Sequence, residues 1–311
     1  MRVLVAGCAG FIGFHLSERL LRDGHEVIGV DNFCTGSQLN ADHLQTYPRF
    51  RFQRHDITTP LAVEGPLERI YDMACPASPL DFGPRRLDIL AVCSRGVWEL
   101  AELARRSGAR LLHASTSEVY GDPQEHPQRE TYWGHVNPIG PRACYDEGKR
   151  FAEALLTSYR AAYGTEIRLP RIFNTYGPNM RRDDGRMLPT FIDQALRGVP
   201  LTVHGDGSQT RSFCYVSDLV EGLVRLMESD VREPVNLGNP VEITVLAAAQ
   251  EVLQLTGSRS PIAHEPRPKD DPALRRPDTT RAQTLLGWWP VVERADGFAR
   301  TIEWLKNTPA A

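Results

Sequence analysis

Four absences in this 311-residue chain argue against whole classes of protein. No stretch approaches the ~18 consecutive apolar residues of a membrane-spanning helix. We also expect no signal peptide, because a short apolar strand follows the first two residues. The six cysteines include no CxxC pair, which argues against a metal site or a redox motif. The chain has 36 basic and 39 acidic residues and so a net charge of −3, so no basic surface for nucleic acid is expected. The sequence therefore predicts a cytoplasmic protein with free thiols, without metal, membrane or nucleic-acid partners.

Strands and helices alternate along the first half of the chain. Apolar runs predict strands at 2–6, 26–30, 50–55, 69–74, 109–115 and 166–173. Helical patterns occur at 11–22, near 84–106 and at 144–163, and a loop rich in Pro, Gly, Asn and His fills 120–143. Such alternation is typical of an α/β fold, a doubly wound parallel sheet with helices on both faces.

The second half is less regular. Short strands are predicted at 201–203 and 211–216, helices near 188–197, 217–228 and 244–256, and a polar, proline-rich segment at 258–278. No repeat or linker separates the two halves. We therefore expect a first domain over 1–178, to which 212–238 also contribute, interleaved with a smaller C-terminal α/β substrate lobe over 179–311.

A glycine-rich turn joins the first strand to the first helix. Gly7, Gly10 and Gly13 have the spacing GxxGxxG, which permits a tight turn, close approach of backbone to a pyrophosphate, and helix–strand packing. Asp31 ends the second strand, where its carboxylate can accept from ribose hydroxyls and would repel the extra phosphate of NADP. The sequence thus predicts a Rossmann-type NAD site, with a purely structural turn as the alternative. The further cofactor contacts that we predict are Phe11, Ile12, Asn32, Asp56, Ile57 and Ala74.

A second constellation combines a tyrosine and a lysine. Tyr145 and Lys149 are four residues apart and so share one face of a helix. Thr116 lies at the end of a central strand, where ligands of open α/β sheets bind. A lysine ammonium favours the phenolate and lowers the tyrosine pKa, so Tyr145 is predicted to take a hydroxyl proton while hydride leaves to NAD. The alternative is an ordinary contact of an amphipathic helix.

At these residues the chain resembles the extended short-chain dehydrogenases/reductases, and among them the UDP-glucuronate decarboxylases, or UDP-xylose synthases. The matching stretches are 116–123, 132–149, 171–178, 184–186, 200–203, 207–211, 235–240, 270–272, 275 and 277–278. The resemblance covers nearly the whole chain. It implies a cavity for a UDP-sugar and possible homodimers.

The resemblance implies oxidation of UDP-glucuronate at C4. The resulting UDP-4-keto acid loses carbon dioxide readily, because its carboxylate is beta to the ketone, and return of the hydride gives UDP-xylose. Glu118 is then implied as an acid–base group or water positioner, with Ser117 as a helper. Arg211 is implied to face the substrate carboxylate, since a guanidinium suits carboxylate recognition. A solvated loop acid and a surface salt bridge are the alternatives for Glu118 and Arg211.

Matching to the family also suggests contacts for the nucleotide end of the substrate. Asn174, Arg186 and Arg275 would lie near the diphosphate or carboxylate, with Arg275 as the bidentate cation. The strand 201–205 would lie along the uracil, which makes Leu201, Val203 and His204 candidate contacts.

The chain departs from the family pattern near the cofactor. Asp88, Cys93 and Cys75 stand where relatives carry Lys, Asn and Ser, and Ser37 replaces an Arg. The change from Lys to Asp would repel an anionic ligand. We therefore expect slower nucleotide handling, with release of some UDP-4-keto-pentose beside UDP-xylose.

Two other functions fit the same fold. One is a sugar-nucleotide 4-epimerase or 4,6-dehydratase, although a dehydratase typically pairs Asp with Glu after the threonine, where this chain has Ser117 and Glu118. The other is a non-catalytic nucleotide-binding protein, against which the joint presence of Thr116, Tyr145 and Lys149 argues.

Overall fold

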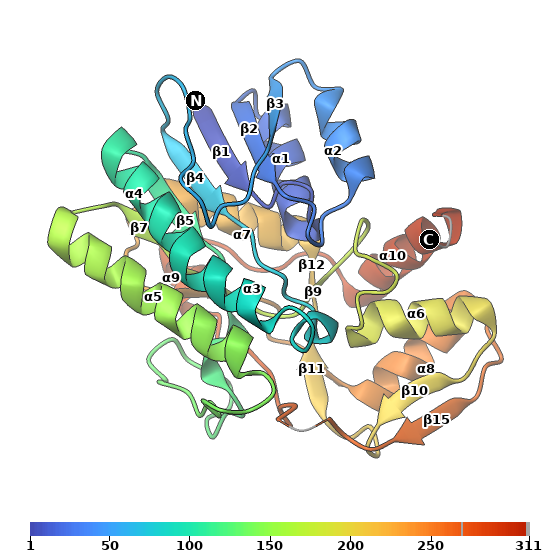
Figure 1. Cartoon of the computed structure of the whole chain (residues 1–311). Coiled ribbons are helices and arrows are strands. Elements are labelled where there is room, and N and C mark those ends of the chain that lie inside the picture. The colour runs from blue at the N-terminus through green and yellow to red at the C-terminus, as the bar shows by residue number, and fades with distance from the viewer. Residues whose placement is uncertain (269, 309–311) are drawn as a thin grey trace.

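A computed structural model describes residues 1–268 and 270–308 of the chain (Figure 1). Its central element is a six-stranded, wholly parallel sheet in the order β3-β2-β1-β4-β5-β7. The strands are β1 Arg2–Ala6, β2 Glu26–Asp31, β3 Phe50–Arg54, β4 Arg69–Asp72, β5 Arg110–His113 and β7 Ile167–Arg168. The strand order reverses between β1 and β4, and ligands bind beyond the carboxyl ends of the strands at such a switch point. The predicted doubly wound sheet is confirmed.

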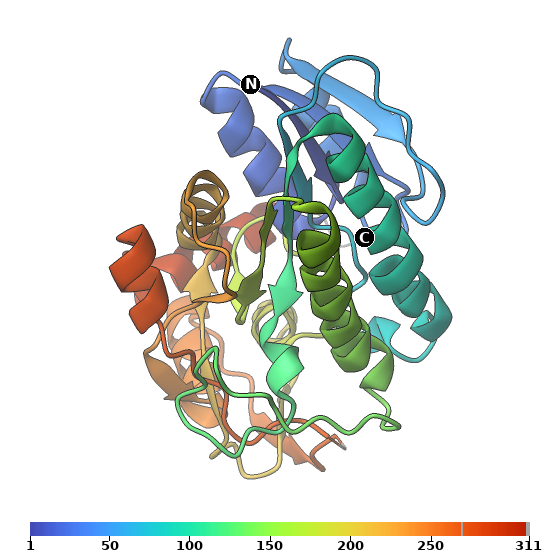
Figure 2. The same cartoon turned by 90° about the vertical axis from the view of Figure 1, so that its left-hand side faces the viewer.

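Helices cover both faces of this sheet, as Figure 2 shows. Helices α1 Phe11–Arg22 and α7 Val216–Glu228 lie on one face, and α4 Val97–Ser107 and α5 Ala143–Tyr163 on the other. Successive side chains of β1 alternate between them: Val3 and Val5 join the core under α1, and Leu4 and Ala6 join the core under α4. Burial on both faces explains why the first strand is entirely apolar after its first residue.

The long helix expected near 84–106 consists of three pieces. Helix α3, Arg86–Ala91, passes through a π turn, Val92–Gly96, into α4. Single π turns within helices are frequent at functional sites. This turn buries Cys93 against the underside of α5, where a Cβ on Gly148 would lie 3.2 Å from the Cys93 sulfur.

The C-terminal lobe lies below the carboxyl ends of the sheet in Figure 1. Helices α6 Met187–Arg197 and α8 Val245–Thr256 pack on the strand pair β10 Leu201–His204 and β15 Ile262–Glu265. Three smaller groups of strands complete the fold. In the first, β8 Pro170–Ile172 lies between β6 Ser115–Thr116 and β13 Val235–Leu237. The others pair β9 Thr175–Tyr176 with β12 Cys214–Tyr215, and β11 Thr210–Ser212 with β14 Glu242–Thr244. The sequence reading missed the helices α2 Gln38–Gln45, α9 Thr280–Leu286 and α10 Arg294–Asn307.

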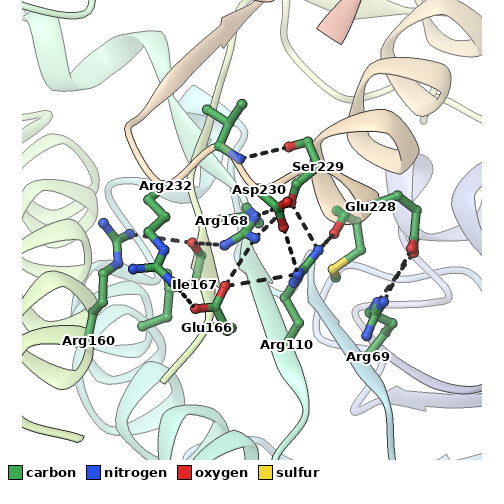
Figure 3. A network of polar contacts seen from close by, with 12 residues as sticks. Arg69, Arg110, Arg160, Glu166, Ile167, Arg168, Glu228, Ser229, Asp230 and Arg232 are labelled. Carbon is green, nitrogen blue, oxygen red and sulfur yellow. Dashed lines mark hydrogen bonds and ion pairs between the residues drawn. The ribbon is translucent and has the colours of Figure 1, made fainter. Parts of the chain in front are cut away.

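An arginine network fastens α7 to the amino-terminal edge of the sheet (Figure 3). Arg168 of β7 is fully buried, and its Nε and Nη2 donate to the Ser229 carbonyl at 3.0 and 2.7 Å. Arg110 of β5 donates to the Met227 carbonyl at 2.7 Å. The last carbonyls of a helix have no partner within it, so these guanidinium groups satisfy them and favour the negative helix end. On these contacts we propose that 212–238 belong to the sheet domain.

Candidate active site

The glycine turn is shaped so that side chains cannot enter it. Gly7 has φ +77°, and a Cβ there would lie 2.8 Å from the Ala74 backbone nitrogen. A Cβ on Gly13 would lie 2.0 Å from the Gly7 carbonyl oxygen. Gly10 is the N-cap of α1 and offers no side-chain cap, so the first amides of the helix keep their hydrogen-bonding capacity for a phosphate. The turn therefore fits a dinucleotide pyrophosphate.

Asp31 ties the glycine turn to the end of β2. Its carboxylate accepts from the backbone amides of Ala9 at 2.9 Å and Phe33 at 2.8 Å. Burial raises the pKa of this carboxyl above its ordinary value. Beside it, the Asn32 side-chain amide donates to the Asp56 carboxylate at 3.0 Å. Two acids thus flank the place where the ribose and adenine of a dinucleotide bind in this fold.

A cavity of about 530 Å³ opens beyond the carboxyl ends of the strands. It brings together side chains that the sequence spreads over some 260 residues. Of the predicted site residues, those lining it are Phe11, Ile12, Thr116, Ser117, Glu118, Tyr145, Lys149, Asn174, Arg186, His204, Arg211 and Arg275. The other predicted cofactor residues are not among its lining residues. The glycines and Ala74 follow β1 and β4 at the switch point of the sheet, whereas Asp31 and Asn32 lie at the end of β2, and Asp56 and Ile57 follow β3.

Tyr145 and Lys149 are both buried on the inner face of α5. The Lys149 ammonium donates to the Ala114 carbonyl at 2.7 Å, and the Phe82 ring stacks on Tyr145 with ring centroids 5.0 Å apart. Burial raises the pKa of Tyr145 to about 12, although Lys149 and a hydrogen bond with Thr116 act in the opposite direction. The phenol is therefore neutral at pH 7 in the cofactor-free protein and needs further positive charge to become a base.

Glu118 lies in the short 3₁₀ turn that follows β6, and two arginines hold its carboxylate. Arg142 pairs with one carboxylate oxygen at 2.5 Å and Arg275 with the other at 3.3 Å. Burial alone would raise the pKa of Glu118, but Arg275 and Arg142 outweigh it and lower the pKa to about 2. The carboxylate is consequently ionised at pH 7. We call Glu118, Arg142 and Arg275 the arginine cage.

The prediction for Arg275 needs correction. It was expected to clamp the diphosphate, but its terminal nitrogens donate to the carbonyls of Ser117 at 2.7 Å and Gly121 at 2.9 Å. Only 1% of the residue is exposed. Arg275 therefore supports the turn that carries Glu118. Arg142, which the sequence reading did not select, completes the cage, and its position one helical turn before Tyr145 was the available signal.

The other predicted cations also have protein partners. Arg211 donates to Asp271 at 2.8 Å, and burial lowers its pKa. Arg186, the N-cap of α6, donates to the Ala77 carbonyl at 2.7 Å and pairs with Asp184 at 3.2 Å. Both line the cavity, so a substrate carboxylate or phosphate can bind there by competing with these acids.

The β10 prediction holds only in part. The side chains of Leu201 and Val203 are fully buried in the core against α6 and α8, so they do not face the cavity. Side chains alternate along a strand, and Thr202 and His204 line the cavity instead. Sequence reading missed Thr202, although the alternation of the strand was the signal.

The side chain of Asp88 is 63% exposed and lies 3.8 Å from Arg85 on α3, and Asp88 is not among the residues that line the cavity. The repulsion expected from Asp88 stays a prediction, because the residues of the cofactor site, such as Asp31, do not line the cavity either. Cys75, in contrast, does line the cavity, and it contacts Cys93.

Over residues 1–268 and 270–308 there is no cluster of three metal-ligating side chains, and no helix long and apolar enough to cross a membrane.

The profile of the NAD dependent epimerase/dehydratase family matches residues 3–238. A protein of Danio rerio named UDP-glucuronic acid decarboxylase 1 is 52% identical over 306 residues, covering 98% of this chain and 73% of the relative. An Arabidopsis thaliana protein of the same name is 49% identical, and the match covers 99% of this chain and 70% of the relative.

Solved structures agree on the fold. UDP-glucose 4-epimerase of Thermotoga maritima, solved with UDP-glucose, is 26% identical with a TM-score of 0.89, covering 98% of this chain and 99% of its own. UDP-glucuronic acid 4-epimerase of Bacillus cereus, solved as a mutant with a fluorinated UDP-glucuronic acid and NAD, is 28% identical with a TM-score of 0.88 and the same coverage. The chain belongs to the NAD dependent epimerase/dehydratase family, in its group of UDP-glucuronic acid decarboxylases.

Proposed function

We propose that this protein is an NAD-dependent UDP-glucuronic acid decarboxylase that converts UDP-glucuronate, through a UDP-4-keto intermediate, to UDP-xylose. Relatives of this name share about half of its residues over nearly its whole length. The observation that carries the proposal is one cavity lined by Tyr145, Lys149 and an ionised carboxylate, Glu118.

The cofactor site would be formed by the glycine turn, the first amides of α1 and Asp31. These groups suit the pyrophosphate and a ribose diol, and Asp31 disfavours a 2′-phosphate. Bound NAD supplies the hydride acceptor for C4 and returns the hydride at the end.

Tyr145 is the base that takes the proton of the C4 hydroxyl. Lys149 and Thr116 lower the pKa of the phenol against the effect of burial. Once C4 is a ketone, the C5–C6 bond can break, because its electron pair is delocalised into the C4 oxygen as an enolate. The neutral phenol of Tyr145 donates a hydrogen bond to that oxygen and so stabilises the negative charge that the enolate places on it.

Glu118 and Arg211 would act at the other side of the ring. The arginine cage keeps Glu118 ionised, so it does not serve as a resident acid. It would instead position a water near C5, from which C5 takes the proton that replaces the carboxylate. Arg211 recognises the substrate carboxylate, and its pairing with Asp271 limits how tightly it holds a charge that must leave as carbon dioxide.

The product mass separates the proposed activity from its rivals. Incubation with UDP-glucuronate and NAD is expected to lower the substrate mass by about 44 Da, the mass of carbon dioxide. A loss of about 18 Da would identify a dehydratase, whereas no change would fit an epimerase or an inactive binding protein. Tyr145→Phe is the matched control. The same spectrum measures any UDP-4-keto-pentose, the side product expected from the departures at Asp88, Cys93 and Cys75.

We propose further that the protein forms a homodimer through α3, α4 and α5. Leu87, Leu90, Trp98 and Phe151 expose large apolar side chains on these neighbouring helices, and such a patch typically marks an interface. Sedimentation velocity of the wild type and Trp98→Glu tests this: the wild type is expected to be a dimer, and the variant is expected to dimerise more weakly.

We also propose a cytoplasmic location, since all six cysteines are free thiols, and cell fractionation would test it.

A further inference from the structure

Two cysteines that are 18 residues apart in the sequence meet beside the catalytic helix. Cys75 follows β4, Cys93 lies in the π turn before α4, and their sulfur atoms are 3.8 Å apart. The sulfurs of Cys34 and Cys144 instead contact the Arg85 guanidinium and the Phe82 carbonyl. The described part of the chain therefore contains a close dithiol that the spacing of its cysteines did not predict.

The surroundings of the pair make one thiol easier to ionise. A hydrogen bond between the two sulfurs lowers the pKa of Cys93 and raises that of Cys75. The nearby Lys149 ammonium favours the thiolate at both positions. The thiolate is the reactive form of cysteine, and a cationic neighbour of this kind is a common feature of reactive thiols.

The pair is also accessible to small reagents. Cys75 lines the 530 Å³ cavity, whereas Cys93 lies behind it and is only 1% exposed. We propose that Cys75 and Cys93 are an oxidative modification site, at which a peroxide that enters the cavity converts the dithiol into a reversible disulfide.

The proposed reaction balances. A thiolate of the pair attacks one peroxide oxygen, the O–O bond breaks, and hydroxide leaves, giving a sulfenic acid. The second thiol attacks that sulfur, the S–S bond forms, and water leaves. The hydroxide takes up the proton that the first thiol released when it ionised. The two cysteines thus lose two electrons and two protons, and hydrogen peroxide is reduced to two waters. A dithiol reductant reverses the reaction by thiol–disulfide exchange.

A disulfide at this place would disturb the catalytic helix. Its S–S bond of about 2.05 Å requires the sulfurs to approach by about 1.8 Å. Cys93 packs on α5 at Gly148, between Tyr145 and Lys149, and shares one apolar cluster with Tyr145 and Cys75. Since a displacement of about 1 Å at a catalytic group can cost about 10²-fold in rate, we expect the oxidised protein to turn over about 10-fold to 100-fold more slowly.

Peptide mass mapping after peroxide treatment tests the site without reference to activity. The wild type, treated with hydrogen peroxide and then alkylated, is expected to yield a linked pair of peptides containing residues 75 and 93. Before alkylation, the mass of the intact oxidised protein should be about 2 Da lower than that of the reduced protein. The number of titratable thiols should fall by two, and dithiothreitol should restore both. Turnover, where it is measurable, should fall and return in parallel. The mass readout distinguishes failure of this inference from failure of the proposed decarboxylase activity.

Cys93→Ser and Cys144→Ser form the matched variants. Cys144→Ser should still form the linked peptides, whereas Cys93→Ser should form none and show no dithiothreitol-reversible loss of turnover. Should Cys93→Ser fail to fold, Cys75→Ser provides the same mass comparison. Oxidation of the wild type to sulfinic acid without a 75–93 link would overturn the inference, as would equal reversible inactivation of Cys93→Ser.

Discussion

Arg142→Gln tests the arginine cage directly. Burial raises the pKa of Glu118, whereas Arg275 and Arg142 lower it. The resulting pKa is about 2, compared with an ordinary value of 4.5. One pH unit corresponds to about 1.36 kcal/mol, so the native structure favours the carboxylate by about 3 kcal/mol. Arg142 supplies one of the two ion pairs to Glu118. We assign to it about half of that energy, roughly 1.5 kcal/mol.

The measurement is a double-mutant cycle with Glu118→Gln, read from urea unfolding of the cofactor-free protein at pH 7. Arg142→Gln should lower the free energy of unfolding by about 1.5 kcal/mol more in the wild type than in the Glu118→Gln background. Its contacts with Asp146 and Phe82 are lost in both backgrounds and cancel. Equal losses in the two backgrounds would refute the cage.

The same cage predicts a pH dependence. Because the folded pKa of Glu118 lies below the unfolded value, its stabilisation is present above pH 4.5 and is lost as the pH falls toward 2. Between pH 7 and about pH 3.5, the wild type should lose about 1.4 kcal/mol more stability than Glu118→Gln. In the Arg142→Gln background this difference should shrink, and an unchanged difference would contradict the assigned cause.

Three further variants test other parts of the structure. Gly13→Ala places a Cβ 2.0 Å from the Gly7 carbonyl oxygen, so we expect at least about tenfold weaker NAD binding by calorimetry; unchanged affinity would remove the turn from the cofactor site. Tyr145→Phe should bind NAD and UDP-glucuronate normally yet lose nearly all turnover, and a near-normal rate would overturn the assigned base. Arg168→Met leaves the Ser229 carbonyl without two hydrogen bonds and should cost about 2–3 kcal/mol in urea unfolding, whereas a surface arginine such as Arg232 should cost little when changed to Met.

Local sequence signals determined the sheet and one half of the site. Apolar strands, the glycine spacing and the four-residue step from Tyr145 to Lys149 are readable because they depend on neighbours along the chain. The predicted bounds of β1 and α1 agree with the structure. Helix α2, which is short and carries polar side chains on most positions, was missed because its period is weak.

Packing between distant parts of the chain brings the charged groups and the sulfur atoms together. Arg275 reaches the turn of Glu118 from 158 residues away, and Arg142 approaches the same carboxylate from α5. The sulfurs of Cys75 and Cys93 come together because a strand end and a π turn pack against one helix. Such meetings arise from packing over long sequence separations, which no local periodicity encodes. The sequence therefore predicts a dinucleotide fold with Tyr145 as the proposed base. The ionisation of Glu118 and the contact between Cys75 and Cys93 depend on the folded chain.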